Sequence, residues 1–442
     1  MKNLKTFPKG GVHPPDRKAL AAGSAIRSAA IPPICIVPLS QHLGKPAQCT
    51  VSPGDTVQPG TVVGTSTGFI SAVVHAPVGG TVKELRTIHL PNGQKTEALV
   101  IETDTETGAE LDYRPSDEWR NLGEAELTER IAACGIVGLG GATFPAHVKF
   151  TVPKGTKVEY FVVNGVECEP YLTADYRLMM EKTDQILKGI DIVRSILHPD
   201  RIVIGIENNK PDAVEKMREA VSGSEYPIDV VPLKLKYPQG DEKQLLKAVT
   251  GREVPSGGLP TAIGAVVSNV GTLNAVYEAV ACNKPLIERV VTVSGNGVAT
   301  PSNLLARLGT PIGDLIEECG GLKGEPVKII SVGPMMGFAV CDLETPVTKG
   351  TSGILVVTAD EIKKNTTTAC LQCGRCIKAC PMGLNPTRLY KWIDHLEYDT
   401  AVDEGLLDCK ECGCCAFSCP ARIPLVQGMK LGKLMIRKKK AN

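Results

Sequence analysis

Two cysteine-rich tracts near the carboxyl end of the chain constrain its fold more than any other feature. CLQCGRCIKACP (370–381) and CKECGCCAFSCP (409–420) both read C-x2-C-x2-C-x3-C-P, and together they hold nine of the chain's 16 cysteines. The first residues, MKNLKTFPKGG, reach proline and glycine before any apolar stretch, so we expect no signal peptide. Metal ligation in a reducing compartment therefore explains the tracts better than disulfide bonds do.

The spacing of the tracts predicts two iron–sulfur clusters. Three thiolates spaced in this way surround one face of a cuboidal cluster, and in two-cluster ferredoxins the fourth cysteine of each tract ligates the other cluster. The first predicted [4Fe–4S] cluster has the ligands Cys370, Cys373, Cys376 and Cys419. The second has the ligands Cys380, Cys409, Cys412 and Cys415, which leaves Cys414 over. A structural zinc site would instead pair two C-x2-C knuckles across a gap, a form that neither tract has.

Composition excludes some classes of protein. A formal charge of +1 and an aromatic content of 4% give no reason to expect binding to nucleic acid. No run of about 18 apolar residues could span a bilayer. We therefore expect a soluble or peripheral protein.

The pattern of elements predicts a multidomain α/β chain with four domains, at 1–122, 123–284, 285–360 and 361–442. The first domain is expected to be all-β, because the turn motifs SPGD (52–55) and QPGT (58–61) separate short β-branched runs. It resembles the β-sandwich barrel of biotinyl and lipoyl carrier domains. The stretch TGFISAVVHAP lacks the lysine that those carriers modify, so a docking or structural role is favoured.

Strands and helices alternate in the second domain. Strands are expected at 159–165, 201–207, 228–235 and 264–270, and helices at 125–134, 181–197, 211–222 and 272–281. This alternation is typical of a largely parallel sheet covered on both faces. The third domain is a smaller unit with a short helix at 310–321. The fourth ends in a basic helix that either caps the clusters or contacts a partner or an anionic membrane surface.

A glycine-rich loop, GIVGLGGATFPAHVK (135–149), is the second strong motif. Gly138, Gly140 and Gly141 allow the backbone to approach a ligand closely, and Lys149 adds a cation suited to a phosphate or an electron-rich ring. The loop follows a predicted helix instead of a strand, so it is not a dinucleotide-binding fingerprint.

Polar residues follow three of the predicted strands. They are Asn164, Glu167 and Glu169, then Gly240, Asp241 and Glu242, and finally Asn269 and Thr272. Each group alone could be an ordinary loop or a helix cap. Because ligands bind in the crevice beyond the carboxyl ends of parallel strands, we expect these groups and the glycine loop to form one site.

The combination resembles known families. GLGGATFPAHVK, VVNGVECEP, the glycine and acidic residues at 240–242, and SNVGTLNAV resemble the FMN- and NADH-binding subunit of respiratory complex I. The third domain resembles the SLBB-like β-grasp domain that follows there. FPKGGVHPPDRK, the carrier-like barrel and the two cysteine tracts are similar to the C subunits of Rnf complexes. The resemblance implies an α/β FMN-binding domain and a C-terminal helical domain of the two-cluster ferredoxin type.

The resemblance also implies cofactors and a function. The glycine loop and Lys149 would hold noncovalent FMN, with Asn164, Glu167 and Asn269 around it and with Glu169 and Glu242 near NAD(H). The acidic NADE-type run of complex I is NGVE in this chain. We expect hydride exchange between NAD(H) and FMN and single-electron relay through two [4Fe–4S] clusters, with no catalytic side chain beyond the flavin site.

Such a protein would be a peripheral subunit on the cytoplasmic side of the cell membrane, in an ion-translocating ferredoxin:NAD oxidoreductase. Its expected partners are the other Rnf-type subunits, ferredoxin through one of them, and NAD(H), but no nucleic acid. A soluble flavo-iron–sulfur protein similar to cobalamin reductase is one alternative. That family begins near the glycine loop, whereas about 120 residues precede the loop here. A non-catalytic electron relay is the other alternative.

Overall fold

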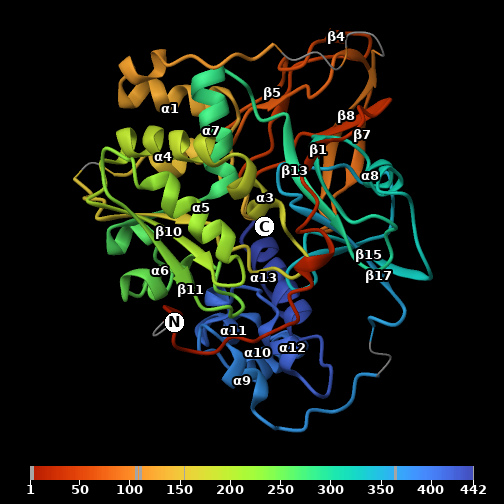
Figure 1. Ribbon diagram of the computed structural model, residues 1–442. Helices are drawn as coiled ribbons and strands as arrows, with labels where there is room; N and C mark the ends of the chain where they lie inside the picture. The colour runs from red at the N-terminus through yellow and green to blue at the C-terminus, as the bar shows by residue number, and fades with distance from the viewer. Residues whose placement is uncertain (1–3, 105–107, 109–111, 154, 363–365, 442) are drawn as a thin grey trace.

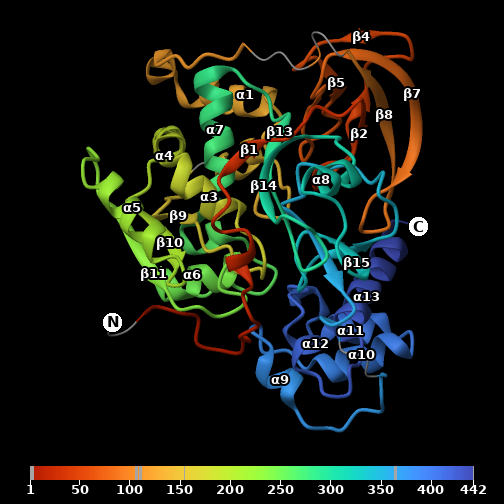
Figure 2. The ribbon, with the colours of Figure 1, turned by 45° about the vertical axis from the view of Figure 1, so that its right-hand side comes forward.

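The computed structural model describes residues 4–104, 108, 112–153, 155–362 and 366–441. Figure 1 shows the barrel (red and orange) above the β-grasp unit (cyan), with the α/β domain (yellow and green) beside them and the cysteine domain (blue) below. Figure 2 shows the same arrangement from a second side. No helix in the described ranges combines the length and apolar character needed to cross a membrane.

The barrel consists of two small antiparallel sheets around an apolar core of Val, Leu, Ile and Ala side chains. One sheet has the order β2-β8-β7-β4, from β2 (Ile34–Pro38), β8 (Lys95–Thr103), β7 (Gly80–His89) and β4 (Thr56–Val57). The other contains β3 (Gln48–Cys49), β5 (Val62–Thr65) and β6 (Val74–His75). Gly54 and Gly60 take φ angles of 95° and 90° in the two Pro-Gly turns, as the motifs predicted. The expected carrier-like barrel is confirmed.

Residues before the barrel strands lie outside the barrel. Strand β1 (Ile26–Ser28) pairs in parallel with β14 (Ser302–Arg307) of the β-grasp unit. Further upstream, isolated bridges join Lys5 to Leu233 and Val12 to Tyr237 in the α/β domain. The sequence places these residues in the domain 1–122, and the boundaries of that domain remain a prediction.

A four-stranded parallel sheet forms the centre of the α/β domain, in the order β11-β10-β9-β12. The strands are β9 (Tyr160–Asn164), β10 (Arg201–Glu207), β11 (Ile228–Leu233) and β12 (Ala265–Asn269). The helices are α1 (Glu124–Ala133), α2 (Ala146–Phe150), α3 (Ala174–Glu181), α4 (Thr183–Leu197), α5 (Pro211–Val221), α6 (Glu242–Thr250) and α7 (Val270–Cys282).

Alternating side chains of the strands face two separate apolar layers, which explains why the sheet is covered on both sides. Phe161 packs with residues of α4 and α7, whereas its neighbour Val162 packs with residues of α6. The predicted parallel sheet is therefore confirmed. One expected helix, 181–197, begins instead at Thr183, because Lys182 leaves the helical conformation and separates α3 from α4.

The β-grasp unit is a six-stranded mixed sheet in the order β1-β14-β13-β17-β15-β16, with one helix, α8 (Ile312–Glu318). Its remaining strands are β13 (Glu288–Ser294), β15 (Pro326–Ser331), β16 (Phe338–Val340) and β17 (Gly353–Thr358). The cysteine domain is helical, with α9 (Arg375–Ala379), α10 (Pro386–Asp394), α11 (Tyr398–Asp403), α12 (Cys414–Ser418) and α13 (Leu425–Ala441).

Candidate cofactor sites

The two cysteine tracts repeat the same backbone conformation. In the C-x2-C loops, Gln372 and Glu411 have φ angles of 52° and 53°, and the glycines that follow, Gly374 and Gly413, have φ angles of 68° and 78°. Residues in this left-handed region turn the chain tightly, and glycine adopts the region without strain, which is why it suits the position directly after the second cysteine. The short helices α9 and α12 then begin. Each tract therefore forms a loop that closes around a common point.

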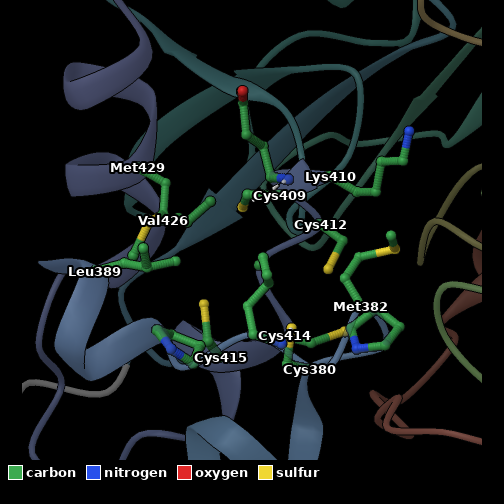
Figure 3. A pocket seen from close by; sticks show the side chains of 15 residues that line it. Cys380, Met382, Leu389, Cys409, Lys410, Cys412, Cys414, Cys415, Val426 and Met429 are labelled. Atoms are coloured by element: carbon green, nitrogen blue, oxygen red, sulfur yellow. Dashed lines mark hydrogen bonds between the residues drawn. The ribbon is translucent and has the colours of Figure 1, made fainter. Parts of the chain in front are cut away.

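The structure divides the cysteines between two pockets. The outer cysteine pocket is lined by Cys370, Cys373, Cys376 and Cys419. The inner cysteine pocket is lined by Cys380, Cys409, Cys412 and Cys415, together with Cys414 (Figure 3). Each predicted ligand set thus surrounds one pocket, and each pocket includes the fourth cysteine of the opposite tract. Ligation of iron by these residues remains a prediction.

Each predicted ligand set offers four cysteine sulfurs, the donor set that a four-iron cluster takes. Among the described residues, no three His, Cys, Asp or Glu side chains lie close enough to hold a single metal ion. Sulfur atoms on one zinc ion would each lie about 2.3 Å from the metal, whereas the thiolates of a four-iron cluster are spread around a larger body. Backbone N–H groups of Gln372 and Glu411 donate to Cys370 Sγ and Cys409 Sγ, both at 3.4 Å. Such hydrogen bonds stabilise thiolates.

The cysteines that line the inner pocket are less exposed than those that line the outer pocket. Cys380 and Cys412 are buried, whereas Cys370 and Cys373 are exposed. Burial raises the pKa of Cys409 to about 11 and the pKa of Cys415 to about 12. These thiols must therefore lose protons when they ligate a metal.

Helix α13 covers the inner pocket. Its residues Val426 and Met429 line the pocket (Figure 3). Lys433 Nζ donates to the carbonyl of Cys409 at 2.6 Å and pairs with Glu411 at 2.8 Å. The basic helix thus acts as a cap, one of the two roles that the sequence left open. Its outer face still exposes Leu431 and Leu434.

The glycine loop lies against the amino-terminal end of α7. The N–H of Leu139 donates to Thr272 Oγ1 at 2.9 Å, and a Cβ on Gly140 would lie 3.2 Å from the Cβ of Asn269. Gly140 and Gly141 are exposed. Helix amino-terminal ends and glycine N–H groups favour anions, and phosphate binding by this loop remains a prediction.

The barrel contacts the start of the same loop. Lys349, which is fully buried, donates from Nζ to the carbonyl of Gly135 at 2.7 Å and to the carbonyl of Val73 in the barrel at 2.8 Å. This contact agrees with the structural role expected for the barrel.

Two asparagines mark the point where the strand order of the sheet reverses. Asn164 and Asn269 are register partners at the carboxyl ends of β9 and β12. Asn164 Nδ2 donates to the carbonyl of Gly240 at 2.9 Å, and Asn269 Nδ2 donates to Asp175 Oδ2 at 2.7 Å. The strand-end groups and the glycine loop therefore meet beyond the carboxyl ends of β9 and β12, the place, called the crevice of an open α/β sheet, where such sheets bind ligands.

Several predicted residues also stabilise helix ends. Asn269 Oδ1 accepts from the N–H groups of Gly271 and Thr272 and caps α7. Glu167 accepts from the N–H of Asp175 at 2.7 Å, at the start of α3. Asp241 caps α6, and burial raises its pKa.

Lys149 and Glu242 form an ion pair at 2.6 Å beside the crevice, and each side chain is about one-third exposed. This pair joins α2 to α6. The predicted phosphate-binding cation and one predicted nucleotide-binding carboxylate are thus neighbours.

Glu169 lies apart from this group. Its carboxylate accepts from the N–H groups of Met335 at 3.2 Å and Met336 at 2.8 Å, in the loop between β15 and β16. Burial raises the pKa of this carboxyl to about 7, although the two N–H groups and Lys18 oppose the shift. Glu169 therefore joins the α/β domain to the β-grasp unit.

The raised pKa of Glu169 predicts a pH dependence of stability. In the unfolded chain the pKa of this carboxyl is about 4.5, so the folded protein holds the proton more tightly. The neutral carboxyl therefore contributes to the free energy of unfolding at low pH, and this contribution is lost as the pH rises from about 4.5 through about 7. The glutamine of Glu169→Gln does not titrate. As the pH rises from 4.5 to 8, we therefore expect the free energy of unfolding of the variant to increase relative to that of the wild type by on the order of 2–3 kcal/mol. Urea unfolding of both proteins at pH 5 and pH 8 measures the difference. An equal difference at both pH values would contradict the prediction.

Sequence reasoning missed several buried or half-buried charged residues near the crevice. Burial and the Glu167 carboxylate raise the pKa of Asp175 to about 7. Lys18 Nζ donates to the carbonyl of Leu172 at 2.6 Å, and Lys210 Nζ donates to the carbonyl of Val166 at 2.7 Å. Asp175 lies in the polar stretch that follows β9, a signal that could have identified it. The lysines had no comparable signal.

Three family models match the chain. The RnfC barrel sandwich hybrid domain matches residues 5–106, the Nuo51 FMN-binding domain matches residues 131–278, and the SLBB domain matches residues 290–339. These matches agree with the barrel, the α/β domain and the β-grasp unit.

Curated relatives match almost the whole chain. The C subunit of a proton-translocating ferredoxin:NAD(+) oxidoreductase complex from Clostridium ljungdahlii is 47% identical, over 87% of this chain and 84% of the relative. The C subunit of a Na(+)-translocating complex of the same kind from Acetobacterium woodii is 39% identical over 98% of both chains. The C subunit of an ion-translocating oxidoreductase complex from Rhodobacter capsulatus is 39% identical, over 96% of this chain and 82% of the relative.

A solved structure shares part of the fold. A chain of an NAD+-reducing [NiFe]-hydrogenase in the H2-reduced state superposes with a TM-score of 0.50 at 16% sequence identity. The match covers 73% of this chain and 63% of the hydrogenase chain.

Proposed function

Since this chain belongs to the family of C subunits of ion-translocating ferredoxin:NAD(+) oxidoreductase complexes, we propose that it exchanges electrons between NAD(H) and two iron–sulfur clusters through FMN. Its partners are the other subunits of such a complex, together with NAD(H) and ferredoxin. FMN accepts hydride and releases electrons singly, and each cluster carries one electron. A protein of this kind is a peripheral member of a membrane complex, on the cytoplasmic side.

One observation carries the proposal: the inner cysteine pocket adjoins the loop that borders the candidate flavin site, which the glycine loop and the strand-end groups form. Tyr237 begins this loop, and its hydroxyl donates to the carbonyl of Cys412 at 2.8 Å. Gly240 in the same loop accepts from Asn164. This placement supports an electron path from the crevice to the inner pocket and then to the outer pocket, whose exposed cysteines face a partner.

The residues of the crevice have distinct proposed roles. The glycine loop and Lys149 bind the FMN phosphate, and Asn164, Glu167 and Asn269 contact the flavin. Gly240, Asp241, Glu242 and Thr272 shape the nucleotide site. Because Glu169 bonds to the β-grasp loop, we assign it a role at the domain boundary as well as near NAD(H). The cobalamin reductase alternative is not favoured, since the relatives span the barrel as well.

Oxidation of NADH by ferricyanide separates the proposal from a non-catalytic relay. We expect the purified chain with FMN and both clusters to reduce two ferricyanide ions per NADH, because a hydride carries two electrons. The same chain stripped of flavin serves as the control. A flavin-loaded chain without this activity would show that the protein only relays electrons.

A further inference from the structure

The N-terminal residues run between the α/β domain and the cysteine domain, as both ribbon views show (Figures 1 and 2). We call residues 5–12 the N-terminal strap. Lys5 forms a bridge to Leu233 at the end of β11. Val12 and Tyr237 exchange both backbone hydrogen bonds, each at 2.9 Å. The strap is therefore fixed to the α/β domain at two points.

The strap also holds the first cysteine tract. The N–H of Gly11 donates to the carbonyl of Ala379 at 2.9 Å. A Cβ on Gly10 would lie 2.4 Å from the carbonyl oxygen of Cys380, so the strap and the tract touch so closely that only glycine fits. Cys380 is the cysteine that the first tract contributes to the inner cysteine pocket.

Tyr237 holds the second tract. Its hydroxyl donates to the carbonyl of Cys412 at 2.8 Å, and Cys414 Sγ donates back to the carbonyl of Tyr237 at 3.9 Å. Tyr237 as a whole residue is only 3% exposed, and it packs in an apolar group with Val12 and Ala379. Tyr237 thus contacts the strap and both cysteine tracts, and it is the first residue of the loop that borders the candidate flavin site.

We propose that Tyr237 is a positioning residue that, together with the N-terminal strap, fixes the inner cysteine pocket against the α/β domain and so sets the rate of electron transfer between the two. The inference rests on the proposed function. It gives Cys414 a role without ligation: the thiol completes the contact with Tyr237. It also explains why an N-terminal segment that joins no barrel sheet lies beside the cysteine tracts.

Tyr237→Phe removes only the hydroxyl and is the main test. In the full chain with FMN and both clusters, we expect unchanged iron and flavin content and unchanged NADH:ferricyanide activity. Amide exchange in 376–381 and 410–416 should become about five- to tenfold faster, the effect of losing one buried hydrogen bond. After addition of NADH, reduction of the inner cluster should become slower, and its paramagnetic resonance spectrum should change while that of the outer cluster does not.

Two further variants sharpen the test. Gly10→Ala pushes the strap away from Cys380 and should slow reduction of the inner cluster from the side of the first tract. Tyr390→Phe is the control: it removes a hydroxyl from α10 of the cysteine domain and should leave amide exchange and inner-cluster reduction unchanged. The inference is overturned if Tyr237→Phe and Gly10→Ala both reduce the inner cluster at the wild-type rate. A wild-type chain whose flavin NADH cannot reduce would instead count against the proposed function.

Discussion

Cys419→Ser is expected to remove or convert the same cluster as Cys370→Ser. Cys419 belongs to the second tract by sequence, but it lines the outer pocket with Cys370, Cys373 and Cys376. A cubane held by three thiolates is lost or loses one iron, so the iron content should fall from about eight per chain to about four if the cluster is lost and to about seven if it is converted. Iron analysis and electron paramagnetic resonance of the purified variants measure both the loss and the identity of the cluster.

Two other variants complete the comparison. Cys409→Ser should affect the inner cluster, because Cys409 lines the inner pocket. Cys414→Ser should keep about eight irons, since Cys414 follows Cys412 after a single residue and its thiol bonds to Tyr237. If Cys419→Ser gave the spectra of Cys409→Ser, each tract would ligate its own cluster, and the interleaved assignment would be wrong.

The sequence predicted those features that local patterns determine. The two x2 spacings place three sulfurs of each tract around one point, and the arrangement of two-cluster ferredoxins assigned the fourth cysteine of each tract to the other set. The Pro-Gly turns similarly identified the barrel. Alternating apolar strands and amphipathic helices identified the parallel sheet and therefore the edge at which Asn164 and Asn269 lie together.

Contacts between distant segments had no such pattern. Val12 pairs with Tyr237, and Lys18 reaches Leu172, across long stretches of chain. A single strand such as β1, which joins the β-grasp sheet, has too few residues to show a period. The sequence also could not separate helix capping from cofactor binding, because an amide or carboxylate at the start of a helix suits both roles. Glu167 and Asn269 show the ambiguity, since both bond to helix N–H groups.

Lys149→Gln is expected to weaken FMN binding strongly while leaving the iron content unchanged. The ammonium group follows the glycine loop, which lies against the amino-terminal end of α7, the end of a helix that attracts a phosphate. A charge-assisted hydrogen bond to a phosphate contributes enough that its loss should raise the dissociation constant for FMN by about 10- to 100-fold. Titration of the flavin-free chain with FMN, followed by flavin fluorescence, measures this change.

Glu242→Gln is the matched control, because it breaks the same ion pair but keeps the cation. The pair is about one-third exposed, so its loss should change the free energy of unfolding by at most about 1 kcal/mol in either variant. With its carboxylate partner neutralised, Lys149 remains available to the phosphate, and FMN should bind Glu242→Gln at least as tightly as the wild type. Equal losses of FMN affinity in both variants would mean that the ion pair, by joining α2 to α6, supports the site, and that the charge of Lys149 does not bind the phosphate.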